Sequence, residues 1–314
     1  MKKKWVLRLS EIQEATACEV LSDVLEDCNG VSIDTRKPME NDMFVAIKGE
    51  NFDGHDFLTQ AVEKGARILL IHREPEGLDQ LKSKVSIVKV ADTTKALQDI
   101  ARYWRRKCLV RVVGITGSNG KTTTKDFTTA ILGTKFKVHS TQGNLNNHWG
   151  VPLTLLSIKP TDDIAVLELG MNHLGEISEL TQIAEPDVVV VTSVGPSHIG
   201  EVGSMNDIKK AKQEIYDNAP EGATAIFNLD NEYTTKMYNE YMEKFPKAKV
   251  MTYSSYKKDK SIQVHMICAH VSLVNLEVQG RILSRSSNAS LRMTGRHNVY
   301  NLMAAAAIAA AMGM

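Results

Sequence analysis

The chain has 314 residues, and its 38 lysines and arginines nearly balance 37 aspartates and glutamates, which leaves a formal net charge of +1. This length suggests two domains or three small ones. The charge balance excludes the broad basic surface of a typical nucleic-acid-binding protein, so any phosphate ligand must be held by a local site. The four cysteines lack the spacing of a metal site, which fits reduced thiols in a cytoplasmic protein and not a disulfide framework.

Neither end of the sequence indicates a membrane segment. The basic start at 1–4 is followed by an apolar stretch that Arg8, Ser10 and Glu11 interrupt, unlike a signal peptide. The alanine-rich segment 304–311 is shorter than the roughly 20 residues that cross a bilayer. We therefore expect a cytoplasmic protein without membrane insertion.

The first predicted domain covers residues 1–107 and is a small α/β module. Short apolar runs, which are candidate strands, lie at 43–47, 68–71 and 85–90. They alternate with a helical pattern at 57–65. An amphipathic helix with a cap signal at Asp92 is expected at 92–106, and a new strand is expected to begin at Leu109.

The second predicted domain, 108–314, repeats the order strand then helix. Its candidate strands lie at 110–115, 165–169, 188–191 and 225–228. Such an alternation indicates a parallel, doubly wound sheet. Alternating apolar residues between 262 and 293 indicate an antiparallel excursion, and the segment 298–312 returns to helix. The expected fold class is α/β, with a small N-terminal α/β domain followed by this mostly parallel central domain.

A glycine-rich turn between a predicted strand and a predicted helix is the strongest local motif. It reads Gly-Ile-Thr-Gly-Ser-Asn-Gly-Lys-Thr-Thr-Thr over residues 114–124. Glycines let backbone N–H groups face an anion, Lys121 supplies a positive charge, and Thr122 can reach Mg²⁺. Counted from Gly114, the spacing is one residue longer than in the common phosphate-binding loop. A plain glycine turn does not account for Gly-Lys-Thr after a strand, so we predict a nucleoside triphosphate site.

This longer loop resembles that of the Mur ligases, ATP-dependent enzymes that extend UDP-linked cell-wall precursors. Further segments resemble the family in order and spacing, at 32–36 with 44–49, 141–147, 168–172 and 295–301. The segments at Asn144 and Glu168 favour the branch that joins D-Ala-D-Ala to UDP-N-acetylmuramoyl-tripeptide. The resemblance runs from about Val31 to the last residue. It implies a P-loop central domain that binds ATP and a first domain that binds the precursor.

The resemblance assigns binding residues for both substrates. For ATP these are Gly117, Ser118, Asn119, Gly120, Lys121, Thr122, Thr123, His297, Asn298 and Asn301. For the precursor they are Thr35, Arg36, Lys48, Asp53, Gly54, His55, Thr141, Asn144 and Asn147. Arg36 and Lys48 suit the pyrophosphate, and Thr35 suits the nucleotide. Taken without the resemblance, an Asp34–Arg36 surface pair and ordinary turn chemistry at the asparagines explain these residues as well.

The resemblance also implies the groups that act on the transferred phosphoryl. The catalytic residues are Lys121, Glu168, His198 and Lys212, and the Mg²⁺ ligands are Thr122, Glu168, His198 and a carbamylated Lys212. Glu168 follows an apolar strand, at the edge of a parallel sheet where ligands bind. Gly200 stands where the family pattern has an acidic residue, which weakens the alignment at His198. Asn228 and Asp230 end the next strand and are expected to support this region.

The implied reaction has two steps. The precursor's terminal carboxylate attacks the γ-phosphate of ATP, which gives an acyl phosphate and ADP, and the amine of D-Ala-D-Ala then displaces phosphate to form an amide. Complete family members have a third, C-terminal domain that closes on ATP and recognises the amine. The sequence ends at Met314, before such a domain, so we expect impaired turnover from this chain by itself. We also expect a monomer.

Three other functions are compatible with parts of this pattern. A module that binds nucleotide sugar and ATP without forming product would lack substrate-dependent phosphate release. A related ligase would act on another UDP-linked peptide or a polyglutamate-type acceptor, which the segments at 32–48 and Asn144 disfavour. A kinase with an unrelated acceptor would leave a phosphorylated product. The third residue of the precursor, lysine or diaminopimelate, is left open.

Overall fold

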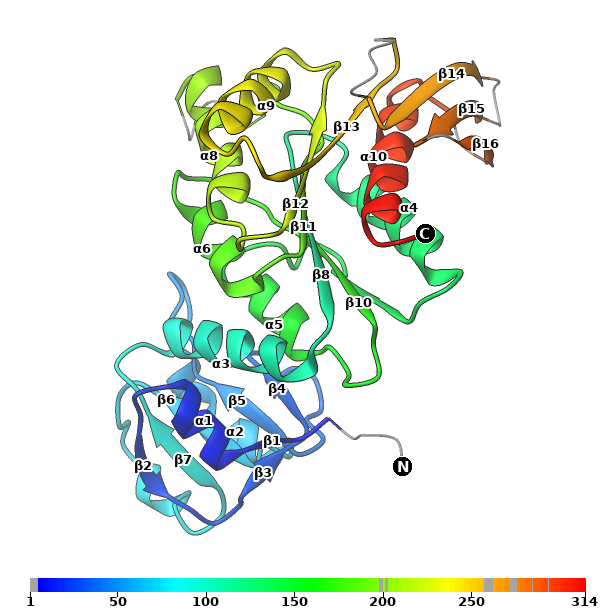
Figure 1. The fold of residues 1–314 in the computed structure, drawn as a ribbon. Coiled ribbons are helices and arrows are strands. Elements are labelled where there is room, and N and C mark those ends of the chain that lie inside the picture. Colours follow the sequence, from blue (N-terminus) through cyan, green and yellow to red (C-terminus); the bar gives the residue numbers. More distant parts are fainter. Residues whose placement is uncertain are drawn as a thin grey trace. The chain divides into compact units, whose positions relative to one another are not determined.

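The computed structural model describes residues 5–197, 200, 203–256, 262–271, 276–283, 285–292 and 294–314, and it divides into two compact units (Figure 1). The first unit contains Met1–Leu109 and His148–Thr161, and the second contains Val110–Asn147 and Asp162–Met314. The segment 148–161 lies beyond the linear division expected at residue 107, yet it packs with the first unit.

A five-stranded sheet in the order β2-β7-β6-β5-β4 forms the centre of the first unit. Its strands are β2 (Glu19–Ser22), β4 (Gly30–Ser32), β5 (Asp42–Val45), β6 (Ile68–Ile71) and β7 (Ser86–Lys89). Strands β4 to β7 are parallel, and β2 pairs antiparallel with β7. A separate ribbon pairs β1 (Leu7–Arg8) with β3 (Asp27–Cys28). Phe44, Leu69 and Ile87, from three neighbouring strands, are buried in the core of the unit.

Helices complete the first unit. They are α1 (Leu9–Ala15), η1 (Gly54–Phe57), α2 (Leu58–Glu63), η2 (Leu78–Gln80), α3 (Thr93–Cys108) and α5 (Gly150–Leu156). The predicted cap of α3 is confirmed, because the Asp92 carboxylate accepts the N–H groups of Thr94 and Lys95. Two indole N–H groups join α3 to the segment that contains α5: Trp104 donates to the Ile158 carbonyl at 3.0 Å, and Trp149 donates to Thr94 Oγ1 at 3.0 Å.

One predicted element is wrong at its boundary. Leu109 was expected to begin a strand, but α3 continues to Cys108, and Leu109 ends it in the left-handed region with a φ of 54°. A left-handed residue satisfies the geometry of a helix end. The Leu109 side chain is 86% exposed, and β8 begins at Arg111. Apolar character alone therefore misplaced the strand.

A nine-stranded sheet in the order β16-β15-β14-β13-β12-β11-β8-β10-β9 forms the second unit. The strands are β8 (Arg111–Thr116), β9 (Val138–Ser140), β10 (Ile164–Glu168), β11 (Val188–Val191), β12 (Thr224–Asn228), β13 (Lys249–Ser254), β14 (Val264–Val271), β15 (Leu276–Ile282) and β16 (Arg285–Leu291). All pairs from β9 to β14 are parallel, and β14, β15 and β16 are antiparallel. The predicted parallel sheet and its antiparallel excursion are confirmed.

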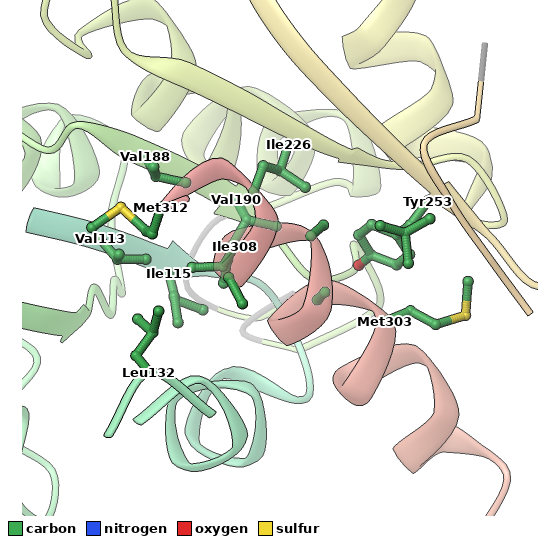
Figure 2. Packing of buried hydrophobic residues seen from close by; sticks show 14 of the residues in the cluster. Val113, Ile115, Leu132, Val188, Val190, Ile226, Tyr253, Met303, Ile308 and Met312 are labelled. Atoms are coloured by element: carbon green, nitrogen blue, oxygen red, sulfur yellow. The ribbon is translucent and has the colours of Figure 1, made fainter. Parts of the chain in front are cut away.

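Helices cover both faces of this sheet. They are α4 (Lys121–Gly133), α6 (Glu176–Ala184), α8 (Met205–Asp217), α9 (Glu232–Lys244) and α10 (His297–Ala311). Helices α4 and α10 lie on one side of the strands, and α6, α8 and α9 lie on the other (Figure 1). Figure 2 shows Ile308 of α10 and Met312, which follows the helix, among Val113, Ile115 and Val190 of the sheet. Among the described residues, no helix is long and apolar enough to cross a membrane.

The strand order creates the position of the site. Strand β8 lies between β10 and β11. After β8 the chain forms β9 and β10 on one side of it, and then crosses over to form β11 on the other side. In open parallel sheets, ligands bind at the carboxyl ends of the strands at such a reversal point. The residues that follow β8, β10 and β11 therefore meet at one edge.

Candidate nucleotide and metal site

The phosphate loop joins the end of β8 to the start of α4. Gly117 has a φ of +148°, and a Cβ there would lie 2.0 Å from Thr192 Oγ1. Gly120 has a φ of +83° and is the N-terminal cap of α4. Only glycine adopts these conformations at little cost and permits so close an approach. The loop thus directs the first backbone N–H groups of α4 toward the edge of the sheet.

The segment 192–195, which follows β11, holds the phosphate loop. Ser118 N–H donates to the Ser193 carbonyl at 2.8 Å, and Ser118 Oγ donates to the Gly195 carbonyl at 3.0 Å. Thr192 Oγ1 donates to the Asn119 carbonyl at 2.6 Å. The segment cannot be predicted locally, because Thr-Ser-Val-Gly has no signature of its own and its partners lie more than 70 positions earlier in the chain.

Three predicted site residues meet beside this loop. Lys121 Nζ donates to the Gly117 carbonyl at 2.8 Å. Burial lowers the pKa of Lys121, and the nearby Glu168 carboxylate opposes that shift. Glu168 Oε2 accepts the Thr122 hydroxyl at 2.9 Å, and Glu168 Oε1 accepts Asn146 Nδ2 at 2.9 Å. A lysine, a hydroxyl and a buried carboxylate are therefore assembled at the start of α4.

Lys212 lies on α8 and is buried, with 2% of its surface exposed. Burial, together with the positive charge of Lys121, lowers the pKa of Lys212 to about 7. Among the described residues, Lys212 forms no ion pair with a carboxylate. A buried lysine of this kind is in part a neutral amine at neutral pH, which is the form that reacts with CO₂.

Asn298 and Asn301 lie on α10, on the side of the sheet opposite to α8 and Lys212, and they connect to the phosphate loop from there. Asn301 Nδ2 donates to Asn298 Oδ1 at 3.1 Å, and Asn298 Nδ2 donates to the Thr294 carbonyl at 2.7 Å. Asn301 Oδ1 accepts Thr124 Oγ1 at 3.4 Å, and a Cβ on Gly120 would lie 2.2 Å from that oxygen. Both asparagines are buried, whereas His297 is exposed at the start of the helix. These asparagines, which were predicted to bind ATP, therefore also support the phosphate loop through Asn301.

The donor set at this edge fits Mg²⁺, which prefers oxygen ligands. Thr122 Oγ1 and Glu168 Oε2 converge, and a carboxylated Lys212 would add a third oxygen donor. In the part of the chain that the structure describes, no group of three or more histidine, cysteine, aspartate or glutamate side chains forms a metal cluster. A hydroxyl and a modified lysine would therefore have to complete the site. His198 lies outside the described residues.

Two further predicted supports, Asn228 and Asp230, lie at the end of β12. Asn228 Nδ2 donates to the Thr192 carbonyl at 2.9 Å, which steadies the segment that holds the phosphate loop. Asp230 accepts the hydroxyl of Ser254, and its other oxygen accepts Ser255 N–H at 2.5 Å. Asn228 therefore acts next to the loop, and Asp230 ties β12 to the end of β13.

The loop after β9 carries the remaining predicted residues of the second unit. Thr141 is fully buried, and its hydroxyl accepts the Glu168 N–H at 3.0 Å. Asn144 and Asn147 are exposed. Asn146, which was not among the predicted site residues, is the asparagine that contacts Glu168. Asparagine in a turn has an ordinary explanation, so the pattern did not distinguish these three.

In the first unit, the residues around β4 are arranged differently. Arg36 is exposed and forms a two-point pair with Asp34, through Nε and Nη2 at 2.8 Å each. The hydrogen bonds from Arg36 lower the pKa of Asp34 to about 2. Thr35 is buried, and its hydroxyl donates to Gln60 Oε1 at 2.7 Å. Of these residues, Arg36 has the most exposed side chain, at 88%.

The segment from Lys48 to His55 is a tight turn organised by Asp53. Lys48 and Asp53 form an antiparallel bridge, and a Cβ on Gly54 would lie 2.8 Å from the Ala46 Cα. Asp53 Oδ1 lies 2.6 Å from Nδ1 of the buried His55, and Asp53 Oδ2 accepts Arg73 Nη2 at 2.9 Å. Asp53, Gly54 and His55 thus support the turn, and Lys48 is exposed on it.

His55 is held as a neutral ring. Its Nε2 accepts the backbone N–H of His72 at 3.0 Å, so the ring proton lies on Nδ1, facing Asp53. Burial lowers the pKa of His55, although Asp53 opposes the shift. Burial raises the pKa of Asp53, but hydrogen bonds from His55 and Arg73 outweigh it and lower that pKa overall.

Comparison with known families gives two matches. Residues 115–309 match the Mur ligase middle domain, and residues 27–105 match the catalytic domain of the Mur ligase family. The first match covers more than half of the chain and includes the phosphate loop, the segment 192–195, Lys212 and the motif on α10.

Individual relatives agree with these matches. The chain is 37% identical over 286 residues to UDP-N-acetylmuramoyl-tripeptide–D-alanyl-D-alanine ligase of Bacillus subtilis, which covers 91% of this chain and 59% of the relative. A crystal structure of MurF from Acinetobacter baumannii superposes with a TM-score of 0.88 at 31% identity and covers all of this chain and 66% of its own. MurF from Thermotoga maritima in complex with ADP gives a TM-score of 0.77 at 27% identity, over 90% of this chain and 63% of its own. The chain thus spans about three fifths of the length of the curated relative.

Proposed function

This chain belongs to the Mur ligase family, and from that premise we propose that it is part of an ATP-dependent ligase that joins D-Ala-D-Ala to UDP-N-acetylmuramoyl-tripeptide. One observation carries the proposal: Lys121, Thr122 and Glu168 meet at the start of α4, at the reversal point of the sheet. This arrangement suits an anionic, metal-bound triphosphate. The similarity to the B. subtilis enzyme supports the identity of the two substrates that are joined.

The second unit binds ATP in this proposal. The phosphate-loop residues from Gly117 to Thr123 hold the phosphates, and Lys121 exchanges the Gly117 carbonyl for a phosphate oxygen. His297, Asn298 and Asn301 lie on the adenosine side. The chain's part in the chemistry is positioning and charge neutralisation, because phosphoryl transfer needs little covalent help from the protein.

Mg²⁺ is the proposed metal, and bound there it supplies charge neutralisation at the phosphates. Thr122, Glu168, His198 and a carbamylated Lys212 are its proposed ligands. Burial and the lowered pKa of Lys212 support the modification, because a neutral amine forms a carbamate with CO₂ and an ammonium does not. Burial of Glu168 beside the loop supports its part.

The first unit binds the UDP end of the precursor in this proposal. Arg36 and Lys48 contact the pyrophosphate, and Thr35 contacts the nucleotide after leaving Gln60. Asp53, Gly54 and His55 shape the turn that carries Lys48. In the second unit, Thr141, Asn144 and Asn147 belong to the loop assigned to the same substrate. The division at residue 107 into a precursor domain and an ATP domain, the cytoplasmic location and the monomeric state are parts of the same proposal.

The reaction places the two substrates in sequence. The precursor's terminal carboxylate attacks the γ-phosphorus of ATP, and ADP leaves. The amine of D-Ala-D-Ala then attacks the acyl carbon, phosphate leaves, and the amine gives up one proton as the amide forms. Lys121 offsets the charge of the transferred phosphoryl throughout the first step.

Calorimetric titration tests the proposal directly. UDP-N-acetylmuramoyl-tripeptide, UDP-glucose and Mg-ATP are titrated separately into the chain. We expect micromolar binding of the precursor and Mg-ATP and much weaker binding of UDP-glucose, which shares the UDP group but not the peptide. Equal binding of the two UDP compounds would show a generic nucleotide-sugar module. ATP binding without precursor binding would reject the proposed substrate.

Turnover is measured as phosphate release in the same chain. Release that requires both precursor and D-Ala-D-Ala supports the ligase reaction. Release of phosphate that depends on neither peptide contradicts it, and a phosphorylated product that persists with D-Ala-D-Ala present would indicate a kinase.

A further inference from the structure

Lys125 is a buried lysine that the phosphate-loop motif does not include. It lies on α4, one helical turn after Lys121, and 6% of its surface is exposed. Burying an ammonium group is costly unless the protein replaces the lost water hydrogen bonds. An apolar side chain would fill this position at less cost. The lysine therefore has to be explained by what its Nζ contacts.

Among the described residues, Lys125 Nζ has one polar contact in the protein interior and one at the surface. It donates to the carbonyl of the fully buried Thr141 at 3.0 Å. It also lies 3.0 Å from Asp126 Oδ1, whose side chain is 64% exposed. Because the exposed Asp126 remains hydrated, its ion pair contributes little, and the buried contact with Thr141 explains why a lysine occupies this position.

Thr141 passes this restraint on to Glu168. The Thr141 N–H donates to the Val166 carbonyl at 3.1 Å, which aligns Thr141 with β10. The Thr141 hydroxyl accepts the backbone N–H of Glu168 at 3.0 Å. Thr141 is thus fixed on one side by Lys125 and fixes the end of β10 on the other.

The same loop closes around the carboxylate of Glu168 from a second direction. Asn146 Nδ2 donates to Glu168 Oε1 at 2.9 Å, and the Asn146 carbonyl accepts Gly170 N–H at 2.8 Å. Glu168 Oε2 is left facing Thr122 Oγ1. The direction of the carboxylate therefore depends on where the loop 141–146 begins, and Lys125 holds that beginning.

We propose that Lys125 is a positioning residue that anchors Thr141 and thereby aims the Glu168 carboxylate at the metal–nucleotide site. The metal part of this inference rests on the proposed function. Lys121 and Lys125 then divide two tasks on one helix face. Lys121 meets the ligand, and Lys125 fixes the loop that orients the carboxylate.

Lys125→Met tests the inference, because methionine has a similar length but donates no hydrogen bond. Lys135→Met is the matched control, since Lys135 also donates to a backbone carbonyl, that of Gly313, but is exposed. ADP affinity is measured by calorimetry with and without Mg²⁺. For Lys125→Met we expect the Mg²⁺-dependent gain in affinity to fall roughly tenfold, as for other groups that orient a metal ligand. Affinity without Mg²⁺ should change less than about twofold.

Other outcomes overturn the inference. An unchanged Mg²⁺-dependent gain would show that Lys125 only fills the interior. An equal loss with and without Mg²⁺ would show that it acts on the nucleotide or on the fold as a whole. Thr141→Val provides a second variant, because it removes the acceptor of the Glu168 N–H and keeps the carbonyl that Lys125 contacts. It should reproduce the loss, and combining it with Lys125→Met should add little.

Amide hydrogen exchange provides a readout that needs no ligand. Peptides covering 141–147 and 164–170 should exchange faster in Lys125→Met than in the wild type or Lys135→Met, while the core strand β11 stays protected. Unchanged exchange in both peptides would overturn the positioning role. A wild-type chain that binds no ADP would reject the proposed function instead, and the exchange result would still decide the role of Lys125.

Discussion

Lys125 and Lys212 in the second unit are buried, and Lys121 beside them is half-buried, whereas Arg36 and Lys48 in the first unit are exposed. In the second unit, protein hydrogen bonds fix Glu168 on both oxygens. In the described part of the first unit, Arg36 is paired with Asp34, two positions before it, and with no other carboxylate. Preorganised groups act strongly in a site that excludes water. Exposed groups contribute less to binding, because their side chains must first be ordered and lose bound water. The two regions should therefore respond differently to substitution.

Lys121→Met should have the largest effect on binding. A charge-assisted hydrogen bond contributes about 1.5–3 kcal/mol, so Mg-ATP affinity should fall roughly 10- to 150-fold. Among the described residues, the one hydrogen bond of Lys121 Nζ is to the Gly117 carbonyl at 2.8 Å, so stability should change little. Calorimetric titration measures the first quantity and urea unfolding the second. Lys135→Met controls for loss of a positive charge, and an equal loss of affinity in that variant would contradict a local role.

Gly120→Ala should destabilise the second unit by about 1–3 kcal/mol, because alanine is strained at positive φ. Its Cβ would also meet Asn301 Oδ1 at 2.2 Å. Gly133→Ala is the matched control on the same helix, since a Cβ there meets nothing within 4 Å. It should be neutral or stabilise by about 0.5–1 kcal/mol. Urea unfolding of both variants decides the point, and effects of the same sign would refute the argument from the loop.

Part of this difference between the two units can be predicted from the sequence, and the rest cannot, because it depends on contacts between residues far apart in the chain. The phosphate loop and the place of Glu168 at a strand end follow from local patterns and from the geometry of parallel sheets. The contacts of Lys125 with Thr141 and of Thr192 with Asn119 join residues 16 and 73 positions apart, which no local pattern specifies. Leu109 shows the opposite error, because an apolar residue was assigned to a strand although it ends a helix.

The first unit shows the same limit of prediction from sequence. The residues proposed to bind the precursor around Arg36 and His55 can be predicted as a set, but the sequence does not separate exposed residues from buried supports. Burial does so, because His55 is enclosed beneath Asp53, whereas Arg36 is exposed to solvent. Trp104 and Ile158 likewise assign the segment 148–161 to this unit, through a contact across 54 positions.

His55 should make the stability of the first unit depend on pH. Burial lowers its folded pKa below the unfolded value of about 6.5, so between these two pKa values the folded state binds fewer protons than the unfolded state. The stabilisation is complete above pH about 6.5 and is lost as pH falls toward the folded pKa, by at most about 1.4 kcal/mol per pH unit. His55→Gln should flatten this slope between about pH 7.5 and 5, where aspartates with an unfolded pKa of about 3.9 still contribute little. Parallel slopes in wild type and variant, measured by urea unfolding, would contradict the assignment.

Arg36→Ala should have the smallest effect on stability and a selective effect on binding. An exposed ion pair contributes about 0–1 kcal/mol, so unfolding should change by less than about 0.5 kcal/mol. Precursor affinity should fall roughly tenfold if Arg36 meets the pyrophosphate, and Mg-ATP affinity should stay constant. Lys37→Ala, one position along and also exposed, controls for net charge.

Asp34→Asn should change precursor affinity in the opposite direction. It releases Arg36 from its carboxylate partner and should raise precursor affinity a few-fold. A fall in precursor affinity in Asp34→Asn would show instead that the precursor binds the intact Asp34–Arg36 pair.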